Sequence, residues 1–380
     1  MIPYGQQDIS PNDIEEVVRV LQSDFLTQGP RVPAFERSIC KTVGSSYAVA
    51  VNSATSALHI ACLALGLKRG DILWTVPNSF VASANVALFC GAEVDFVDIT
   101  NDTFLMCPDA LEHKIKKAAL ENKLPKILMP VHFAGQSCNM EKIGAIAKKY
   151  NIKVIEDASH AIGAKYKNKP IGDCTFSDIS VFSFHPVKII TTGEGGIATT
   201  QDSYLAERMK VFRSHGVTRD QAQLIDQNQG SWYYEQVDLG FNYRMTDIQA
   251  ALGCSQLERL EKFVTLRNEF ASRYDILLKE IDVQCPIIDD DNYSAHHLYP
   301  IQVSNRSRVF EFLRSNGIGV NVHYIPIHLQ PFYRKKGFSP GDFPNSEKYY
   351  SRAISIPLYP GLMEKNQDKI VETLKDALNA

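Results

Sequence analysis

The sequence predicts an α/β protein in which a mostly parallel seven-stranded sheet with helices on both faces is followed by a smaller α+β unit. Between residues 47 and 200, short β-branched runs alternate with stretches of helical character, a rhythm typical of parallel sheets. The chain of 380 residues also exceeds the usual size of one hydrophobic core, which predicts a large and a smaller domain sharing a cleft. The seven strands are expected at 47–51, 72–76, 94–97, 127–131, 153–156, 179–182 and 196–199.

A first helix is expected before the sheet, ending near Ser23. Ser10 is suited to cap it, Pro11 to occupy its first position, and Asp13 to supply the acid of a capping box. Apolar residues then recur at helical spacing, at positions 14, 17, 18 and 21.

A second long helical pattern, from Thr246 to about Lys279, is interpreted as the connection into the smaller unit. The predicted domains are therefore 1–255, a large α/β domain with an N-terminal arm, and 256–380, a small α+β domain. Residues 287–293 are expected to form an exposed loop.

The composition is that of an ordinary soluble globular protein and argues against several other classes. With 44% hydrophobic and 22% charged residues, no run of about 18 apolar residues and no secretory signal at the N-terminus, the sequence predicts a cytoplasmic protein that is not inserted in a membrane. A net charge of −3 without basic blocks argues against nucleic acid and favours a small ligand. The eight cysteines form no C-x-x-C pair, so neither a disulfide framework nor a metal site is predicted.

Polar residues follow three of the predicted strands. Asn52, Asp157 and Ser183 stand at carboxyl ends, where ligands of parallel sheets bind. About 30 residues after Asp157, the stretch Ser183-Phe-His-Pro-Val-Lys188-Ile-Ile-Thr-Thr-Gly-Glu-Gly-Gly196 carries a lysine on a glycine-rich turn. Taken alone, an Asp is most often a cap and a Lys a solvated residue, so only their arrangement is informative.

An acid at a strand end and a lysine on such a turn are the two groups that a pyridoxal-5′-phosphate (PLP) enzyme requires. The carboxylate of Asp157 would keep the pyridine nitrogen of the cofactor protonated. The amine of Lys188 would form the Schiff base and then act as general base and acid.

The glycine-rich stretch resembles the signature of the DegT/DnrJ/EryC1/StrS sugar aminotransferases, a PLP-dependent family of fold type I. Four further blocks resemble that family in the same order and extend the resemblance over most of the chain: Leu26-Thr-Gln-Gly-Pro30, Asn52-Ser-Ala-Thr-Ser-Ala-Leu58, Gly240-Phe-Asn-Tyr-Arg-Met-Thr246 and Val322-His-Tyr-Ile-Pro-Ile-His328. The resemblance implies transamination, because relatives that are dehydratases carry a histidine where this chain has Lys188.

The resemblance also assigns cofactor contacts beyond Asp157 and Lys188. Ala54 and Thr55 open a helix whose N-terminus suits a phosphate, with the Thr55 and Ser183 hydroxyls as added donors. By the resemblance, Phe80 stacks on the pyridine ring, and His160, where many members carry glutamine, lies on the side of the 3-oxygen. Asn242 corresponds to an asparagine that reaches the phosphate from the neighbouring subunit, which implies a homodimer with a shared active site.

The family acts on nucleotide-linked keto-sugars and usually takes the amino group from L-glutamate. Three blocks are most similar to members that aminate C4 of UDP-2-acetamido-2,6-dideoxy-β-L-arabino-hex-4-ulose in pseudaminic acid biosynthesis: Asn52-Ser-Ala-Thr-Ser-Ala57, Ser159-His160-Ala161 and Phe212-Arg-Ser-His-Gly216. The product is UDP-4-amino-4,6-dideoxy-N-acetyl-β-L-altrosamine. The implied substrate-binding residues are Tyr4, Asp24, Phe25, Leu26, Thr27, Ala54, Ser183, Asn242, Val322, His323, Tyr324 and Ile325.

Two alternatives remain open at the level of the sequence. The chain could aminate another UDP- or dTDP-keto-sugar, or it could bind PLP as a non-catalytic regulatory protein. A nicotinamide or flavin enzyme is disfavoured, because Gly193-Glu-Gly-Gly lacks the G-x-G-x-x-G spacing that follows a first strand.

Overall fold

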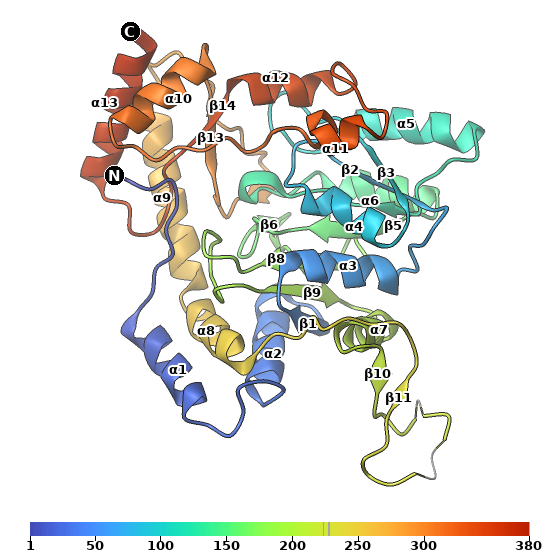
Figure 1. Cartoon of the computed structure of the whole chain (residues 1–380). Coiled ribbons are helices and arrows are strands. Elements are labelled where there is room, and N and C mark those ends of the chain that lie inside the picture. The colour runs from blue at the N-terminus through green and yellow to red at the C-terminus, as the bar shows by residue number, and fades with distance from the viewer. Residues whose placement is uncertain (223, 227–228, 380) are drawn as a thin grey trace.

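The computed structural model describes residues 1–222, 224–226 and 229–379, and it contains the expected sheet (Figure 1). The spatial order of its seven strands is β1-β9-β8-β5-β4-β2-β3. β9 runs antiparallel to both of its neighbours, and the pairs from β8 through β5, β4 and β2 to β3 are parallel, so the mostly parallel seven-stranded sheet is confirmed. The strands are β1 (Tyr47–Val51), β2 (Ile72–Thr75), β3 (Glu93–Phe96), β4 (Ile127–Leu128), β5 (Lys153–Asp157), β8 (Ile179–Ser183) and β9 (Gly196–Thr200).

The predicted strand boundaries agree to within one residue except at β4, which has two residues in place of the five expected. Pro130 has no N–H to donate to the ladder, which ends the regular pairing. The chain nevertheless continues beside β5, since the Asp157 N–H donates to the Pro130 carbonyl at 2.9 Å and Val131 forms an isolated bridge with Asp157.

Helices cover both faces of the sheet, and further short strands lie around it (Figure 1). The helices are α1 (Pro11–Leu21), α2 (Arg31–Val43), α3 (Ala54–Ala64), α4 (Ala82–Phe89), α5 (Pro108–Leu120), α6 (Met140–Lys149), α7 (Ser203–Arg213), α8 (Asp247–Leu257), α9 (Leu260–Leu277), α10 (Arg306–Ser315), α11 (Pro331–Arg334), α12 (Pro344–Arg352) and α13 (Glu364–Asn379), with 3₁₀ turns at Phe133–Gly135 and Ile327–Leu329. The remaining strands are β6 (Lys165–Tyr166), β7 (Lys169–Pro170), β10 (Val217–Thr218), β11 (Glu235–Gln236), β12 (Asn292–Tyr293), β13 (Tyr299–Gln302) and β14 (Ala353–Ile356).

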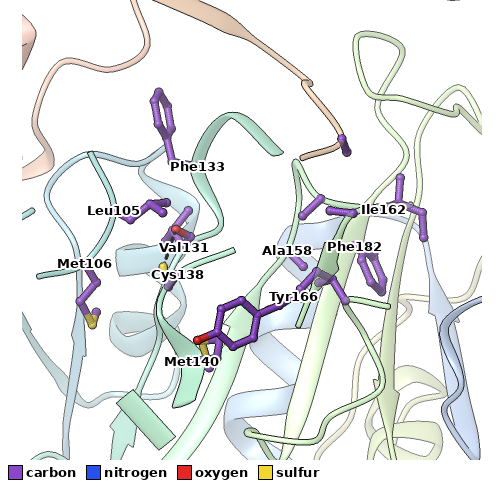
Figure 2. Close-up of a cluster of buried hydrophobic side chains, with 14 of the residues drawn as sticks. Leu105, Met106, Val131, Phe133, Cys138, Met140, Ala158, Ile162, Tyr166 and Phe182 are labelled. Atoms are coloured by element: carbon purple, nitrogen blue, oxygen red, sulfur yellow. Dashed lines mark hydrogen bonds between the residues drawn. The ribbon is translucent and has the colours of Figure 1, made fainter. Parts of the chain in front are cut away.

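The sheet divides the core into two clusters because successive side chains of a strand point to opposite faces. In β1, Ala48 and Ala50 join one cluster, whereas Val49 and Val51 join the other. The first cluster contains side chains of α2, α5 and α6, and the second those of α3, α4 and α7. Figure 2 shows part of the first cluster, with Val131 and Phe133 near one strand end and Phe182 farther along the sheet.

The capping box of the first helix is confirmed. The Asp13 N–H donates to the Ser10 hydroxyl at 3.3 Å, and the Ser10 N–H donates to the Asp13 carboxylate at 2.7 Å. The helix ends at Leu21, two residues before the expected end. Three of the apolar residues that predicted this helix, Ile14, Val18 and Leu21, are exposed in the single chain.

The single long helix predicted from Thr246 to Lys279 is wrong, since α8 and α9 are separate helices. α8 packs against α1 and α2, whereas α9 extends toward α13 at the far end of the molecule (Figure 1). The chain changes direction at Glu258 and Arg259. There the Arg259 guanidinium forms ion pairs with Asp8 and Asp13, which fix the bend.

The C-terminal part has its own core around the antiparallel pair β13 and β14, packed between α9, α10 and α13. Other residues beyond 255 belong to the core clusters of the large sheet, among them Leu298 and Tyr349 in one and Ile327 and Tyr333 in the other. The division into 1–255 and 256–380 therefore stays a prediction. Among the described helices, none combines the length and apolarity needed to cross a membrane.

Candidate active site

A cavity of about 800 Å³ opens at the carboxyl ends of the parallel strands. Segments far apart in the sequence contribute to its wall: the N-terminal arm, the first turns of α3 and α4, the ends of β5 and β8, and the C-terminal part of the chain. The lining residues are Tyr4, Asn52, Ser53, Ala54, Thr55, Ser56, Leu58, Ser79, Phe80, Ala82, Ser83, Val131, Asp157, Ser159, His160, Ser183, His185, Val187, Lys188, Glu194, Gln249, His297, His323 and Tyr324.

Asp157 is the last residue of β5 and is almost fully buried. One carboxylate oxygen accepts from the Ser159 hydroxyl at 2.6 Å and from the Ser159 N–H at 3.2 Å. The other accepts from the Ser83 hydroxyl at 2.7 Å. Both carboxylate oxygens are thus hydrogen-bonded in this buried position. Asp157 is therefore fixed in orientation and available as an acceptor for a protonated ring nitrogen.

Lys188 lies on the turn between β8 and β9. The turn is held by its own hydrogen bonds: the Lys188 N–H donates to the His185 carbonyl at 2.8 Å, and the Thr191 hydroxyl donates to the Phe184 carbonyl at 3.0 Å. Burial lowers the pKa of the Lys188 amine to about 8, although the carboxylate of Asp157 favours the charged form. With a pKa of about 8, about a tenth of the molecules carry the neutral amine at pH 7, against less than about a thousandth for an ordinary lysine. The neutral amine is the form that a nucleophile or general base requires.

The first turn of α3 offers unpaired backbone donors at the cavity. The Ser53 hydroxyl caps the helix by accepting from the Ser56 N–H at 3.1 Å. Within the described part of the chain, the N–H groups of Ala54 and Thr55 have no partner. A Cβ on Gly196 would lie 2.4 Å from the Ala54 nitrogen, so only glycine lets β9 approach this turn. The free donors at a helix N-terminus fit a phosphate group.

The rings of His160, Tyr324 and Phe133 contact one another, and the first two line the cavity. The Ala134 N–H donates to Nδ1 of His160 at 3.3 Å, so the neutral imidazole carries its proton on Nε2, which lies 3.2 Å from the Tyr324 oxygen. Burial and the charge of Lys188 hold the pKa of His160 well below its ordinary value, so the ring is neutral. Both of its nitrogens are thus used within the chain, and the Tyr324 hydroxyl keeps its own proton to donate into the cavity.

Sequence reasoning missed three residues of this site. Ser159 stands inside the Asp157 block, so its role as a carboxylate donor could have been found there. Ser83 in α4 and His297 near β13 have no motif of their own, and only the fold brings them to the cavity.

Most of the predicted site residues meet in this cavity. Those that line it are Tyr4, Ala54, Thr55, Phe80, Asp157, His160, Ser183, Lys188, His323 and Tyr324. Phe80 is 59% exposed, as expected for a ring that stacks on a bound cofactor.

Seven other predicted residues lie outside the lining of the single chain. Residues Asp24, Phe25, Leu26 and Thr27 form the turn after α1, where Phe25 and Leu26 are exposed. Val322 and Ile325 flank the lining residues of their block. Asn242 is exposed, and its carbonyl accepts from the Asn52 amide at 3.4 Å. The roles assigned to these residues remain predictions.

One cavity of the α/β sheet brings together a hydrogen-bonded carboxylate, a lysine with a lowered pKa and backbone N–H donors suited to a phosphate. These groups together define the class of PLP-dependent enzymes. The sequence profile of the DegT/DnrJ/EryC1/StrS aminotransferase family matches residues 7–375, and the chain belongs to this family. It is a PLP-dependent sugar aminotransferase, as the resemblance implied.

Two relatives and two solved structures illustrate the similarity. The chain is 38% identical to the UDP-4-amino-4,6-dideoxy-N-acetyl-β-L-altrosamine transaminase of Campylobacter jejuni, over 98% of this chain and 96% of the relative. It is 38% identical to the spore coat polysaccharide biosynthesis protein SpsC of Bacillus subtilis, over 99% and 96%. It superposes with a TM-score of 0.91 on Helicobacter pylori PseC, an aminotransferase involved in the biosynthesis of pseudaminic acid, with 33% identity over 100% of this chain and 99% of that one. The putative sugar aminotransferase Spr1654 of Streptococcus pneumoniae in its PMP form gives a TM-score of 0.91 with 31% identity, over 100% and 99%.

Proposed function

We propose that this chain moves the amino group of L-glutamate to C4 of UDP-2-acetamido-2,6-dideoxy-β-L-arabino-hex-4-ulose, giving UDP-4-amino-4,6-dideoxy-N-acetyl-β-L-altrosamine. The observation that carries the proposal is a cavity lined by both Lys188 and Asp157. The carboxylate of Asp157 is held by hydrogen bonds, and its charge acts on the Lys188 amine. The choice of sugar is supported by similarity to the Campylobacter jejuni transaminase and to PseC.

Each residue of the cavity is assigned a role that fits its hydrogen bonds and its pKa. PLP, when bound, supplies an electron sink that stabilises negative charge on the carbon that loses or gains a proton. Asp157, which Ser83 and Ser159 hold in place by hydrogen bonds, would keep the proton on the ring nitrogen. The amine of Lys188 carries a proton between the cofactor and the substrate carbon, and its low pKa lets it accept and release that proton near neutral pH. The N–H groups of Ala54 and Thr55 bind the phosphate.

The active site in this proposal belongs to a homodimer. Asn242 is exposed and lies outside the cavity of its own chain, as expected for a residue that serves the partner. The exposed apolar side chains of α1, together with Phe25 and Leu26, supply surface for the contact between subunits.

A second sugar substrate has a specific observation in its favour. The chain is as similar to SpsC as to the Campylobacter jejuni enzyme, at 38% identity in each case. Another UDP- or dTDP-keto-sugar is therefore the alternative substrate, with the same residues performing the same steps.

The experiment that tests the proposal follows the absorbance of the purified holoenzyme through both half-reactions. L-glutamate should remove the band of the lysine-bound cofactor near roughly 410 to 430 nm, and the UDP-4-keto-sugar should restore it. Restoration only by a different keto-sugar would keep the enzyme class and discard the proposed substrate. Lys188→Ala should lose both the band and all turnover, and turnover retained in that variant would contradict the assignment of Lys188.

A further inference from the structure

His297 has a place in the cavity that neither the PLP site nor the predicted substrate residues account for. Its side chain is 5% exposed and lines the cavity, and its ring centroid lies 4.4 Å from that of His160. Its Nδ1 is fully buried, and within the described part of the chain it has no hydrogen-bond partner. A buried imidazole with an unused nitrogen at a ligand cavity calls for an explanation.

The backbone at His297 is held from behind by Arg267 of α9. The Arg267 guanidinium is fully buried and donates to the carbonyls of His296, His297 and Leu358, at 3.2, 3.3 and 2.9 Å. No carboxylate pairs with it among the described residues. Residue 135 must be glycine for the two segments to pack this closely, because a Cβ there would lie 2.9 Å from the backbone nitrogen of His297.

These neighbours determine which nitrogen of His297 carries the proton. Burial, together with the charges of Lys188 and Arg267, keeps the pKa of His297 well below its ordinary value, so the ring is neutral. An orphaned buried N–H is rarer in proteins than an unused lone pair, and a lone pair is also favoured in the field of Arg267. Nδ1 therefore carries the lone pair, and Nε2–H is the group available to the cavity.

At the corner of the cavity formed by His297, the positive charges of Arg267 and Lys188 both act on the ring and lower its pKa. An anion is the ligand that such a corner prefers. A carboxylate in proteins is commonly bound by an arginine fork, yet within the described part of the chain no arginine lines the cavity. Within the described part of the chain, His297 offers a partner for the carboxylate of the amino donor.

We propose that His297 is a specificity-determining residue that binds the amino donor, its Nε2–H donating to a carboxylate oxygen. This inference rests on the proposed function, in which the donor is L-glutamate. It predicts that His297 serves the half-reaction with the dicarboxylate and not the half-reaction with the neutral sugar ring.

The test compares His297→Leu, which removes the donor, with His297→Gln, whose amide N–H reaches about as far as Nε2–H. In the holoenzyme, the apparent Kd for L-glutamate and the inhibition constant of the unreactive dicarboxylate glutarate should both rise roughly tenfold to a hundredfold in His297→Leu. His297→Gln should recover most of the loss. The half-reaction with the keto-sugar should change less than about threefold, as should both half-reactions in the matched control His113→Leu, on an exposed position of α5.

The outcomes separate this inference from the proposed function. Unchanged glutarate binding in His297→Leu, or an equal loss in both half-reactions, would overturn the role of His297 and leave the proposed function standing. If the wild-type holoenzyme does not react with L-glutamate, the proposed donor is wrong. The proposal for His297 is then overturned as well unless glutarate binding shows the predicted loss and recovery. The lysine-bound absorbance band reports in each variant whether the site has folded.

Discussion

At the scale of single residues, the low pKa of Lys188 has a direct kinetic consequence. The amine must be neutral to attack the aldehyde of PLP, and burial brings its pKa to about 8. The rate of PLP capture by the cofactor-free protein should therefore rise with pH and level off above about pH 8. A solvated lysine would continue to accelerate toward its ordinary pKa of about 10.4.

Stopped-flow absorbance between pH 6.5 and 10 would measure this profile. Because the carboxylate of Asp157 raises the pKa of Lys188, Asp157→Asn should move the midpoint to lower pH. A midpoint above pH 10 in the wild type, or no shift in the variant, would contradict the described electrostatics.

Lys188 and Asp157 could be singled out from the sequence because each lies in a contiguous block whose chemistry is visible locally, and both line the same cavity. The same reasoning cannot find Ser83, which lies 74 residues from the Asp157 carboxylate that it binds. His297 is equally hidden, since its importance depends on Arg267 behind it and on the cavity in front. Such residues act through packing that only the folded chain defines.

At the scale of elements, β9 approaches the backbone of the first turn of α3 closely. A Cβ at Gly196 would lie 2.4 to 2.6 Å from backbone atoms of Ser53 and Ala54, and a backbone cannot move aside as a flexible side chain can. Gly196→Ala should therefore displace the first turn of α3, lower the stability by about 1 to 3 kcal/mol and weaken PLP binding at least tenfold.

The change in stability would be measured by urea unfolding of the cofactor-free protein, and the affinity by PLP titration. Gly361→Ala is a matched control, because a Cβ there would meet only ordinary contacts at 3.8 Å. Wild-type PLP affinity in Gly196→Ala would show that the turn of α3 does not hold the phosphate.

Strands were easier to predict than long helices. The β-branched runs fix the strands because they are buried on both faces, and six of the seven boundaries agree closely. The helical pattern from Thr246 to Lys279 stays apolar across Glu258 and Arg259, so periodicity alone cannot show the break. The ion pairs of Arg259 with the distant Asp8 and Asp13 determine the bend.

The antiparallel direction of β9 was likewise outside the prediction, which described the sheet only as mostly parallel. β8 and β9 are joined by residues 184–195, which contain no helix. A parallel crossover usually contains a helix, so a short connection without one favours an antiparallel return.

At the scale of the whole molecule, buried neutral histidines make the protein sensitive to acid. Burial lowers the pKa of His296 to about 4 and that of His323 to about 3, and His160 and His297 are also held well below the ordinary value. The unfolded chain takes up protons on these rings as the pH falls through about 6.5, while the folded chain does not. The contribution of these four histidines to stability should therefore be full above pH 6.5 and fall steadily below it.

Urea unfolding of the cofactor-free protein at pH 7 and pH 5 would measure the loss. Each such histidine contributes up to about 2 kcal/mol over this interval, so His323→Gln should reduce the pH dependence by about that amount. An unchanged slope in this variant would mean that His323 is protonated in the folded protein.

The first residues of the chain are held by some of the last. The Ile2 N–H donates to the Gly317 carbonyl at 2.8 Å, the Gly319 N–H donates to the Ile2 carbonyl at 2.6 Å, and the Leu358 N–H donates to the Tyr4 carbonyl at 3.1 Å. During synthesis on the ribosome, Tyr4 emerges on the order of tens of seconds before Leu358 exists, since translation adds about 5 to 20 residues each second. Tyr4 is thus synthesised early, but it takes its place in the cavity wall only after the segment around Leu358 has been made.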